Sequence, residues 1–303
     1  AGVKDGLVYA SRSGNGASIA AKIYALDVVD GHTVWVSQNM TKCGPYDGVV
    51  FTPEGDLIVG SFLDLWRIRG SDGTTMWHQT RVGSVSSACG AALYGNSVYI
   101  MDVTGGGHVL VRYDLASGTR LYQSPVMPGF TCENTPMVGA DGTIYLNRAQ
   151  NNASVDFLYA FTDNGTAFVE KWRVPTIYNP YSELGLGPDG SVYAVIPGPQ
   201  LVRLDPANGT ALNYSALPAF SSSRFVVDAD GKVFFSNGGT SNTSLFSYDA
   251  DLTLRWSVPV PSMNIGGPSL GENGTVVVCG VGADVRAYRS VDPAGVVQLP
   301  GGA

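Results

Sequence analysis

A two-residue turn signal followed by a run of strand-forming residues recurs seven times, and this repeat limits the fold more than any other feature of the chain. In the first copy the turn signal precedes the run LVYAS. The seven pairs are Asp5-Gly6, Glu54-Gly55, Gly95-Asn96, Asp141-Gly142, Asp189-Gly190, Asp230-Gly231 and Asn273-Gly274. Such pairs supply the positive φ angles of a tight β-hairpin, and the alternation that follows buries one face of each strand. They recur about every 40 to 49 residues and therefore predict seven copies of one structural unit.

A second landmark follows each hairpin: an apolar strand, a polar turn that usually ends in glycine, and a strand that carries an aromatic residue. Four of the five tryptophans fall at this aromatic position: Trp35, Trp77, Trp172 and Trp256. A large aromatic there can cover the seam between neighbouring units and bury roughly 150–250 Å², so we interpret these residues as structural. Two hairpins make four strands per repeat. The sequence thus predicts an all-β chain, a seven-bladed β-propeller of four-stranded antiparallel blades.

The whole chain, 1–303, is predicted to be a single β-propeller domain, because all-β domains often reach this length. No linker, charge block or low-complexity segment separates the repeats. The predicted blades span approximately 1–40, 41–82, 83–127, 128–175, 176–218, 219–260 and 261–303. Loops that join the second strand to the third, or one blade to the next, are predicted to be the longer ones and to form the binding face. They are 11–22, 39–47, 103–108, 147–156 and 237–244.

The first copy of the second landmark, Ala25-x-Asp27-x-x-Asp30-Gly31-x-x-x-Trp35, resembles a known repeat. It is similar to the tryptophan-docking repeat of the pyrroloquinoline-quinone-like (quinoprotein-type) β-propeller family, and the similarity continues repeat by repeat over nearly the whole chain. That superfamily includes quinoprotein dehydrogenases, a bacterial outer-membrane assembly lipoprotein and many secreted proteins. The resemblance implies the propeller fold and is specific for fold rather than for function; a secreted member is expected.

Four residues depart from the repeat: Arg67, Arg112 and Arg203 replace the usual alanine, and Asn213 stands where a fifth tryptophan would be. The quinoprotein dehydrogenases are usually larger, have eight blades, and carry vicinal cysteines over the quinone. The present chain has no adjacent cysteine pair. We therefore predict no cofactor, no catalytic residue and no metal ligand.

Charge and hydropathy exclude two classes of partner. The net charge is −7 and the pI is about 4.8, so nucleic acid gains no electrostatic attraction and is not an expected partner. No stretch approaches the roughly 18 consecutive apolar residues that span a bilayer, so no transmembrane segment is predicted. A chain that begins at Ala1 is expected to be a processed or truncated product.

Acceptor motifs for N-glycosylation are more frequent than chance. The chain has 15 asparagines, from which about two or three Asn-x-Ser/Thr motifs would arise at random. Seven occur, at Asn39, Asn152, Asn164, Asn208, Asn213, Asn242 and Asn273. Most fall in predicted turns, where an acceptor is exposed, although an Asn-Gly pair also serves turn geometry. The enrichment predicts a secreted or cell-surface glycoprotein.

The four cysteines are not arranged as a zinc site. Cys89 and Cys132 begin the first strands of adjacent predicted blades, where their Cα atoms could approach disulfide distance. We predict a Cys89–Cys132 disulfide, with Cys43–Cys279 as a weaker complement and free buried thiols as the alternative.

Polar and aromatic residues that enter the first strands are the candidates for a ligand-binding central mouth. They are Tyr46, Asp47, Glu133, Asn134, Tyr181, Glu183 and Arg224. Glu133 and Glu183 lie in adjacent predicted blades and could act as a carboxylate pair if about 5 to 10 Å apart. The alternative is a solvated channel rim.

Together these observations favour a non-catalytic extracellular glycoprotein. Its rigid propeller would bind a protein or carbohydrate partner, or self-associate into a surface or filamentous assembly. Two alternatives stay open: a secreted enzyme that acts on polysaccharide or a small substrate at the central mouth, and a bacterial envelope assembly factor. The repeat resemblance favours the last of these and the glycosylation motifs disfavour it.

Overall fold

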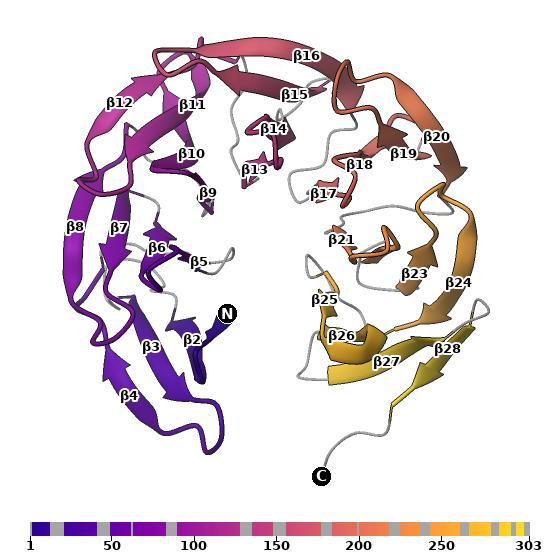
Figure 1. The fold of residues 1–303 in the computed structure, drawn as a ribbon, viewed down its shortest axis with the longest axis horizontal. Helices are drawn as coiled ribbons and strands as arrows, with labels where there is room; N and C mark the ends of the chain where they lie inside the picture. The colour runs from indigo at the N-terminus through magenta and orange to yellow at the C-terminus, as the bar shows by residue number, and fades with distance from the viewer. Residues whose placement is uncertain are drawn as a thin grey trace. The chain divides into compact units, whose positions relative to one another are not determined.

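A computed structural model describes most of the strands and turns of the chain (Figure 1). The described residues are 2–12, 21–40, 49–61, 63–82, 90–127, 135–147, 156–176, 184–198, 200–217, 225–236, 243–260, 267–279, 285–291 and 295–299. They form β-strands joined by turns, together with a short 3-10 turn, η2 (Glu272–Gly274).

The strands make seven four-stranded sheets, in each of which strands that follow one another in sequence lie side by side. The first and second blades contain β1 (Gly2–Lys4), β2 (Leu7–Arg12), β3 (Lys22–Asp27) and β4 (Thr33–Val36), then β5 (Val50–Phe51), β6 (Leu57–Gly60), β7 (Asp64–Ile68) and β8 (Thr75–Thr80). The third and fourth contain β9 (Ala92–Tyr94), β10 (Ser97–Thr104), β11 (Gly107–Asp114) and β12 (Arg120–Gln123), then β13 (Met137–Val138), β14 (Ile144–Asn147), β15 (Asp156–Asp163) and β16 (Phe168–Thr176).

The last three blades repeat this pattern. The fifth and sixth contain β17 (Gly185–Leu186), β18 (Val192–Ile196), β19 (Gln200–Leu204) and β20 (Ala211–Ala216), then β21 (Phe225–Val227), β22 (Val233–Ser236), β23 (Ser244–Tyr248) and β24 (Leu254–Pro259). The seventh contains β25 (Ser269–Leu270), β26 (Thr275–Cys279), β27 (Val285–Val291) and β28 (Gly295–Gln298). The described residues therefore confirm the predicted fold class, an all-β, seven-bladed β-propeller of four-stranded antiparallel blades.

Chain packing divides the protein into two compact units, and the division passes through the fourth blade. Unit 1 comprises Ala1–Ala153 and Phe161–Glu170, and unit 2 comprises Ser154–Ala160 and Lys171–Ala303. The first three blades thus belong to unit 1 and the last three to unit 2. The assignment of one domain, with its seven blade boundaries, stays a prediction.

The predicted turn pairs lie between the first and second strand of each blade. In the first blade Asp5 and Gly6 have φ angles of 50° and 78°, and in the seventh Asn273 and Gly274 have 56° and 69°. Two successive positive φ angles match the right-handed twist of the flanking strands, and Asp, Asn and Gly tolerate them best. In the other five blades only the glycine of the pair has a positive φ angle.

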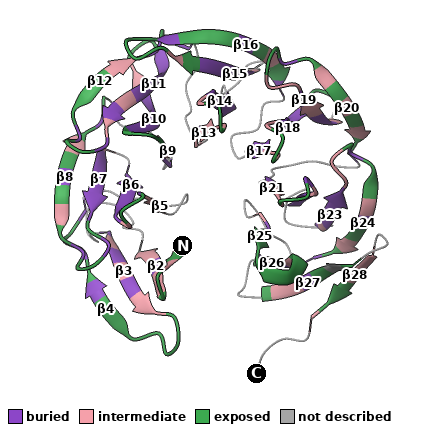
Figure 2. Cartoon of the chain, viewed as in Figure 1, coloured by how far each residue is buried: buried purple, intermediate pink, exposed green. Residues whose placement is uncertain are grey.

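Burial follows the position of a strand within its blade (Figure 2). Second strands such as β6, β14 and β22 are buried at every residue, because both faces of the sheet pack against neighbouring structure. Fourth strands such as β20 alternate between exposed and partly buried residues. In unit 1, apolar clusters join the first blade to the second and the second to the third. Unit 2 has equivalent clusters between its last three blades.

Tryptophans of the fourth strands close the seams between blades, as predicted. Trp35, Trp77 and Trp172 each donate an indole N–H to a backbone carbonyl in the next blade, at 2.9, 2.9 and 3.0 Å. Each ring also lies over the glycine that ends the next blade's turn: a Cβ added to Gly118 would lie 2.7 Å from the Trp77 ring. The tryptophan and the glycine therefore form one packing unit.

The seam between the fifth and sixth blades lacks both parts of this unit. Asn213 faces Arg203 across β19 and β20, in the register at which Trp77 faces Arg67 in the second blade. The next turn carries Leu252 at a φ angle of 68°, where other turns have glycine, and Leu252 is buried. Leu252 packs in the apolar cluster that joins the fifth and sixth blades.

Candidate functional site

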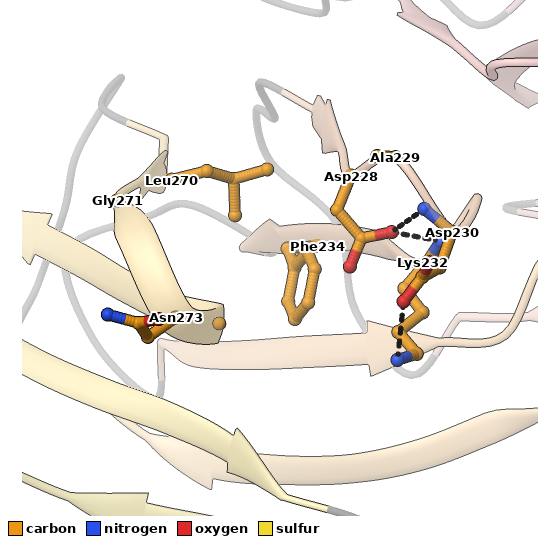
Figure 3. A pocket seen from close by; sticks show the side chains of 9 residues that line it. Asp228, Ala229, Asp230, Lys232, Phe234, Leu270, Gly271 and Asn273 are labelled. Carbon is orange, nitrogen blue, oxygen red and sulfur yellow. Dashed lines mark hydrogen bonds and ion pairs between the residues drawn. The ribbon is translucent and has the colours of Figure 1, made fainter.

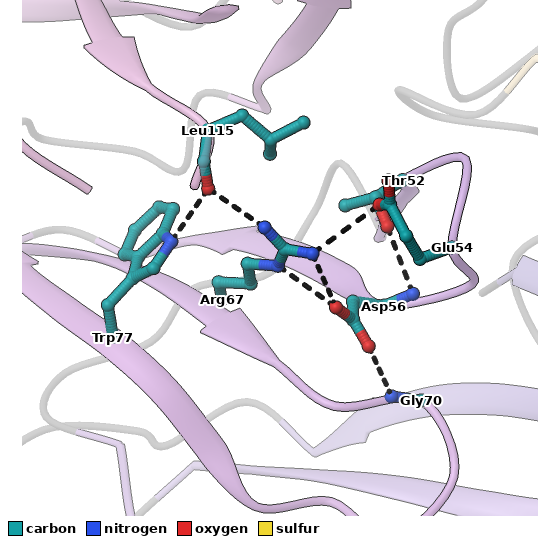
Figure 4. A network of polar contacts seen from close by, with 7 residues as sticks. All are labelled: Thr52, Glu54, Asp56, Arg67, Gly70, Trp77 and Leu115. Atoms are coloured by element: carbon teal, nitrogen blue, oxygen red, sulfur yellow. Dashed lines mark hydrogen bonds and ion pairs between the residues drawn. The ribbon is translucent and has the colours of Figure 1, made fainter. Parts of the chain in front are cut away.

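The turn end of the second blade holds a buried arginine in a dense polar network (Figure 4). Arg67 donates from Nε and Nη2 to Oδ2 of Asp56, at 3.0 and 2.7 Å. Its Nη1 donates to the Leu115 carbonyl at 3.0 Å, the same oxygen that accepts the Trp77 indole. Nη2 also reaches Glu54 at 3.4 Å. All guanidinium nitrogens of Arg67 are therefore engaged within the protein.

An arginine occupies the same repeat position in the fifth blade. Arg203 donates from Nε to Ser191 Oγ at 2.9 Å and from Nη2 to Asp189 Oδ2 at 2.5 Å. Ser191 and Asp189 stand in the turn where the second blade has Asp56 and Glu54. The Nε–Nη2 edge of this second arginine is thus also occupied by its own blade.

The third blade carries Arg112 at this position, but its turn provides Gly95 and Ser97 in place of the two acidic residues. Arg112 pairs instead with the fourth blade, where Nη1 lies 3.1 Å from Asp163 Oδ2. Nη1 also donates to the Tyr122 hydroxyl at 2.5 Å. Nε is buried without a hydrogen-bond partner. Within the described part of the chain, no hydrogen bond or ion pair reaches Nη2 either.

Asp163 is the hub of the contacts across this seam. Burial by itself would raise the pKa of Asp163, but hydrogen bonds donated by Tyr122 and Tyr99 and the charge of Arg112 lower it below its usual value. Burial, followed by the bond to Asp163, raises the pKa of Tyr99 to about 12. The site therefore holds a carboxylate and two neutral phenols at physiological pH.

A cavity of about 350 Å³ opens beside Arg112 in unit 1. Its lining residues come from the turns of the third and fourth blades and from the strands behind them: Tyr94, Gly95, Asn96, Ser97, Tyr99, Arg112, Asp141, Gly142, Thr162, Asp163 and Gly165. The turn of the fourth blade is two residues shorter than that of the third, Asp163 to Gly165 against Asp114 to Gly118. Among the described residues, Arg112 makes no bond to a carbonyl of the next blade's turn like the one that Arg67 makes to Leu115.

Unit 2 has a second cavity, of about 360 Å³, between the sixth and seventh blades (Figure 3). Phe234 and Leu270 form its apolar part, and Asp228 lies at its rim. The Asp228 carboxylate accepts the backbone N–H groups of Asp230 and Lys232, at 3.0 and 2.8 Å. Its polar groups are thus largely used to build the turn.

A further polar cluster lies on the exposed turn of the first blade. Side-chain ligand atoms of Asp27, Asp30 and His32 lie within 4.8 Å of one another, a donor set that can hold a metal ion. The hydrogen bond to Asp30 raises the pKa of His32, and the reciprocal contacts lower the pKa of Asp30. An exposed turn of this composition is common without a metal, and the cluster serves the turn geometry.

The glycosylation motifs fall on both described and undescribed residues. Asn39, Asn164, Asn208 and Asn273 are exposed, and Asn213 is partly buried in β20. Asn152 and Asn242 lie outside the described residues. Asn164 Oδ1 accepts the N–H groups of Thr166 and Ala167, at 3.0 and 2.8 Å, and Asn208 Oδ1 accepts the N–H of Thr210 at 2.8 Å. Occupancy of all seven stays a prediction.

Most of the other predicted site residues lie outside the described part of the chain. This holds for Cys43, Cys89 and Cys132 and for all the candidate mouth residues, Tyr46, Asp47, Glu133, Asn134, Tyr181, Glu183 and Arg224. Cys279, at the end of β26, is exposed with a free thiol in the structure. The disulfide pairings and the mouth therefore stay predictions.

The prediction of a longer binding loop at residues 103–108 is wrong. Strands β10 and β11 extend to Thr104 and Gly107, which pair with each other, so only a tight turn joins the two strands. His108 is fully buried and its backbone pairs with Met127. The glycines of this segment serve the hairpin, not an exposed loop.

The sequence had marked Arg112 as a departure from the repeat but did not predict its cavity. The signal lies in the turns. In the second blade, Glu54 and Asp56 stand four and two residues before Ile58, the residue that pairs with Arg67. In the third blade, Gly95 and Ser97 stand four and two residues before Tyr99, the residue that pairs with Arg112. Aligning the blades at their arginines would have shown that Arg112 has no acidic partner of its own.

Comparisons with known proteins agree with this fold. A family model described as outer membrane protein assembly factor BamB matches residues 19–158. No curated protein sequence matches the chain. Within the described residues, no helix has the length and apolar character that a membrane-spanning helix requires.

Solved structures share the architecture at low sequence identity. BamB from Moraxella catarrhalis is 14% identical with a TM-score of 0.65, over 88% of this chain and 78% of that one. Quinohemoprotein alcohol dehydrogenase from Comamonas testosteroni is 14% identical with a TM-score of 0.71, over 95% and 64%. A europium-containing methanol dehydrogenase is 10% identical with a TM-score of 0.68, over 99% and 77%.

At these identities the shared property is the fold, and this chain spans less than two thirds of the quinohemoprotein. The family-model match and the structural similarities both point to the repeat that the sequence resembles. The predicted resemblance to the pyrroloquinoline-quinone-like β-propeller repeat is confirmed: residues 19–158 match a family model of this type, and the fold is shared with BamB and with the quinohemoprotein dehydrogenase.

Proposed function

We propose that this protein is a non-catalytic extracellular glycoprotein whose propeller is a rigid platform for a protein partner. The observation that carries the proposal is the state of the acceptor asparagines on the turns. Asn164 and Asn208 are exposed, and in both the side-chain oxygen is held by the turn. The amide nitrogen, which carries an N-linked glycan, makes no hydrogen bond within the described residues.

The seams between blades support the platform role. Trp77 and Arg67 both bond to the Leu115 carbonyl of the next blade, so two side chains lock one blade to another. A surface held in this way loses little conformational entropy when a partner binds.

Exposed apolar side chains on the fourth strands support a protein partner, which includes a second copy of this chain. In unit 1, Val34, Met76 and Leu121 each precede the seam aromatic of their strand, and are 46%, 43% and 46% exposed. Apolar residues repeated at one position of an exposed edge favour a protein contact more than isolated ones do.

The experiment is peptide mapping of protein from its native source after N-glycosidase treatment in ¹⁸O water, which labels each formerly glycosylated asparagine as aspartate. We expect label at Asn164 and Asn208 and none in an Asn164→Gln, Asn208→Gln double variant. Unlabelled peptides for all seven motifs would overturn the glycoprotein proposal.

A second candidate is an envelope assembly factor, favoured by the match of residues 19–158 to the outer membrane protein assembly factor family. Deleting the gene in a native bacterial host would then lower the amounts of outer-membrane β-barrel proteins. Unchanged amounts would oppose this candidate. The enzyme alternative depends on Glu133 and Glu183, outside the described residues, and stays a prediction.

A further inference from the structure

Three blades carry an arginine at the same repeat position, so the contacts of each arginine can be compared with those of the other two. In the second and fifth blades the Nε–Nη2 edge of the arginine binds turn residues of its own blade: Asp56 in one, Ser191 and Asp189 in the other. An arginine edge of this kind fits a carboxylate with two parallel hydrogen bonds. The same edge of Arg112 has no such partner among the described residues.

The cavity of about 350 Å³ lies where the missing partner would be, since Gly95 and Ser97 are among its lining residues. Its volume falls within the lower range of natural ligand pockets. The buried Nε of Arg112 has no partner, and an unsatisfied buried donor costs free energy that a bound acceptor would recover.

We infer that this cavity binds an acidic sugar, a hexuronate unit, whose carboxylate takes the place beside Arg112 that Asp56 takes beside Arg67. The inference does not depend on the proposed function, because either a platform or an assembly factor could use such a site. We thereby assign a ligand class to residues for which neither the repeat nor the fold implies a ligand.

The rest of the lining suits a sugar ring better than a simple carboxylic acid. Tyr94 is 44% exposed at the rim, and its ring packs against Gly142, where an added Cβ would lie 3.0 Å away. An exposed aromatic face accommodates the C–H face of a pyranose. Asn96 and Thr162 place an amide and a hydroxyl group along the same cavity for the ring hydroxyls. Asn96 Nδ2 also donates to Asp114 Oδ2 at 2.5 Å, and the Asp141 carboxylate accepts hydrogen bonds from Thr143.

The existing pair with Asp163 does not prevent a second carboxylate from binding. Arg67 already holds two, with Asp56 at 2.7 Å and Glu54 at 3.4 Å from Nη2. Arg112 uses only Nη1 for Asp163 and Tyr122. On the opposite edge of its guanidinium, neither the buried Nε nor Nη2 makes a hydrogen bond within the described residues.

The test is calorimetric titration of the full chain with glucuronate and with glucose, which differ only in the carboxylate. We expect glucuronate to bind and glucose to bind about ten- to a hundredfold more weakly, the loss expected for a hydrogen-bonded charged group. The Arg112→Gln variant should lose the preference for glucuronate. The matched Arg203→Gln variant, whose edge is filled in the protein, should bind both sugars as the natural chain does.

A Ser97→Asp variant keeps the test decisive if Arg112→Gln does not fold. It restores the carboxylate that the second blade has at Asp56, so it should abolish glucuronate binding without lowering the melting temperature. Failure of the natural chain to bind glucuronate would overturn the inference. So would equal affinity for glucose, or undiminished binding by the Ser97→Asp variant.

Discussion

Arg81 and Asp102 form an ion pair across the seam between the second and third blades, and both side chains are 0% exposed. Arg81 Nε donates to Asp102 Oδ1 at 2.7 Å, and Nη1 donates to the Ser61 carbonyl at 2.7 Å. Asp102 Oδ2 accepts the Val82 N–H at 3.0 Å. Burial outweighs these contacts and raises the pKa of Asp102, so the buried carboxylate depends on Arg81 for its charge to be compensated.

Replacing one member of this pair should therefore destabilise the folded protein. We expect Arg81→Met to lower the free energy of unfolding by about 3–5 kcal/mol, because Asp102 would remain buried without its partner. Urea denaturation followed by tryptophan fluorescence measures this. The control is Arg69→Met, which removes the exposed pair with Asp72 and should change nothing measurable. Equal effects of the two substitutions would contradict the account.

Asp163 makes stability depend on pH. Its folded-state pKa is lowered, so the folded state favours the ionised form more than the unfolded state does. This contribution is present above the unfolded pKa, about 3.9, and is lost as pH falls through the folded value.

The Asp163→Asn variant should lose roughly 1.5–3 kcal/mol at pH 7, as expected for hydrogen bonds to a charged group. Its difference from the natural chain should shrink as the pH of the denaturation series is lowered below about 4. A difference that stays constant from pH 7 to pH 3 would show that the carboxylate charge does not matter.

At the scale of the element, the seam between blades depends on a glycine as much as on a tryptophan. Gly31 and Gly118 end equivalent turns with φ angles of 75° and 73°. A Cβ on Gly118 would clash with Trp77 at 2.7 Å, whereas a Cβ on Gly31 would meet nothing within 4 Å. The two positions separate backbone strain from loss of docking.

We expect Gly31→Ala to cost about 1–2 kcal/mol for the left-handed conformation alone. Gly118→Ala should cost about 1–3 kcal/mol more, since the Trp77 ring must move. Thermal or urea unfolding of both variants checks the order. If Gly31→Ala were as destabilising as Gly118→Ala, the docking contact would contribute nothing.

The elements were predictable because their signals are local. Asp5-Gly6 and Asn273-Gly274 demand positive φ within two residues, and Trp35 and Trp77 lie at a fixed spacing from their turns. The Arg112 site was not predictable in this way. Its partner Asp163 is 51 residues away, and its cavity depends on the length of a turn in another blade. Such a site depends on how two repeats differ, not on either repeat alone.

At the scale of the whole molecule, the residues that repeat from blade to blade determine the fold, and features particular to this chain indicate its candidate functions. The fold is shared with BamB and with quinohemoprotein dehydrogenases at 14% identity, so it does not by itself determine an activity. Exposed acceptor asparagines, the seams between blades and the unpartnered arginine edge are features of this chain's own residues. The first two are the basis of the proposed glycoprotein platform, and the third is the basis of the inferred ligand site.

The most direct test of that proposal is the intact mass of the protein from its native source, measured before and after N-glycosidase treatment. We expect a heterogeneous mass that becomes a single, lower mass after the treatment. A single native mass that the treatment leaves unchanged would contradict the proposal and leave the asparagines as turn residues only.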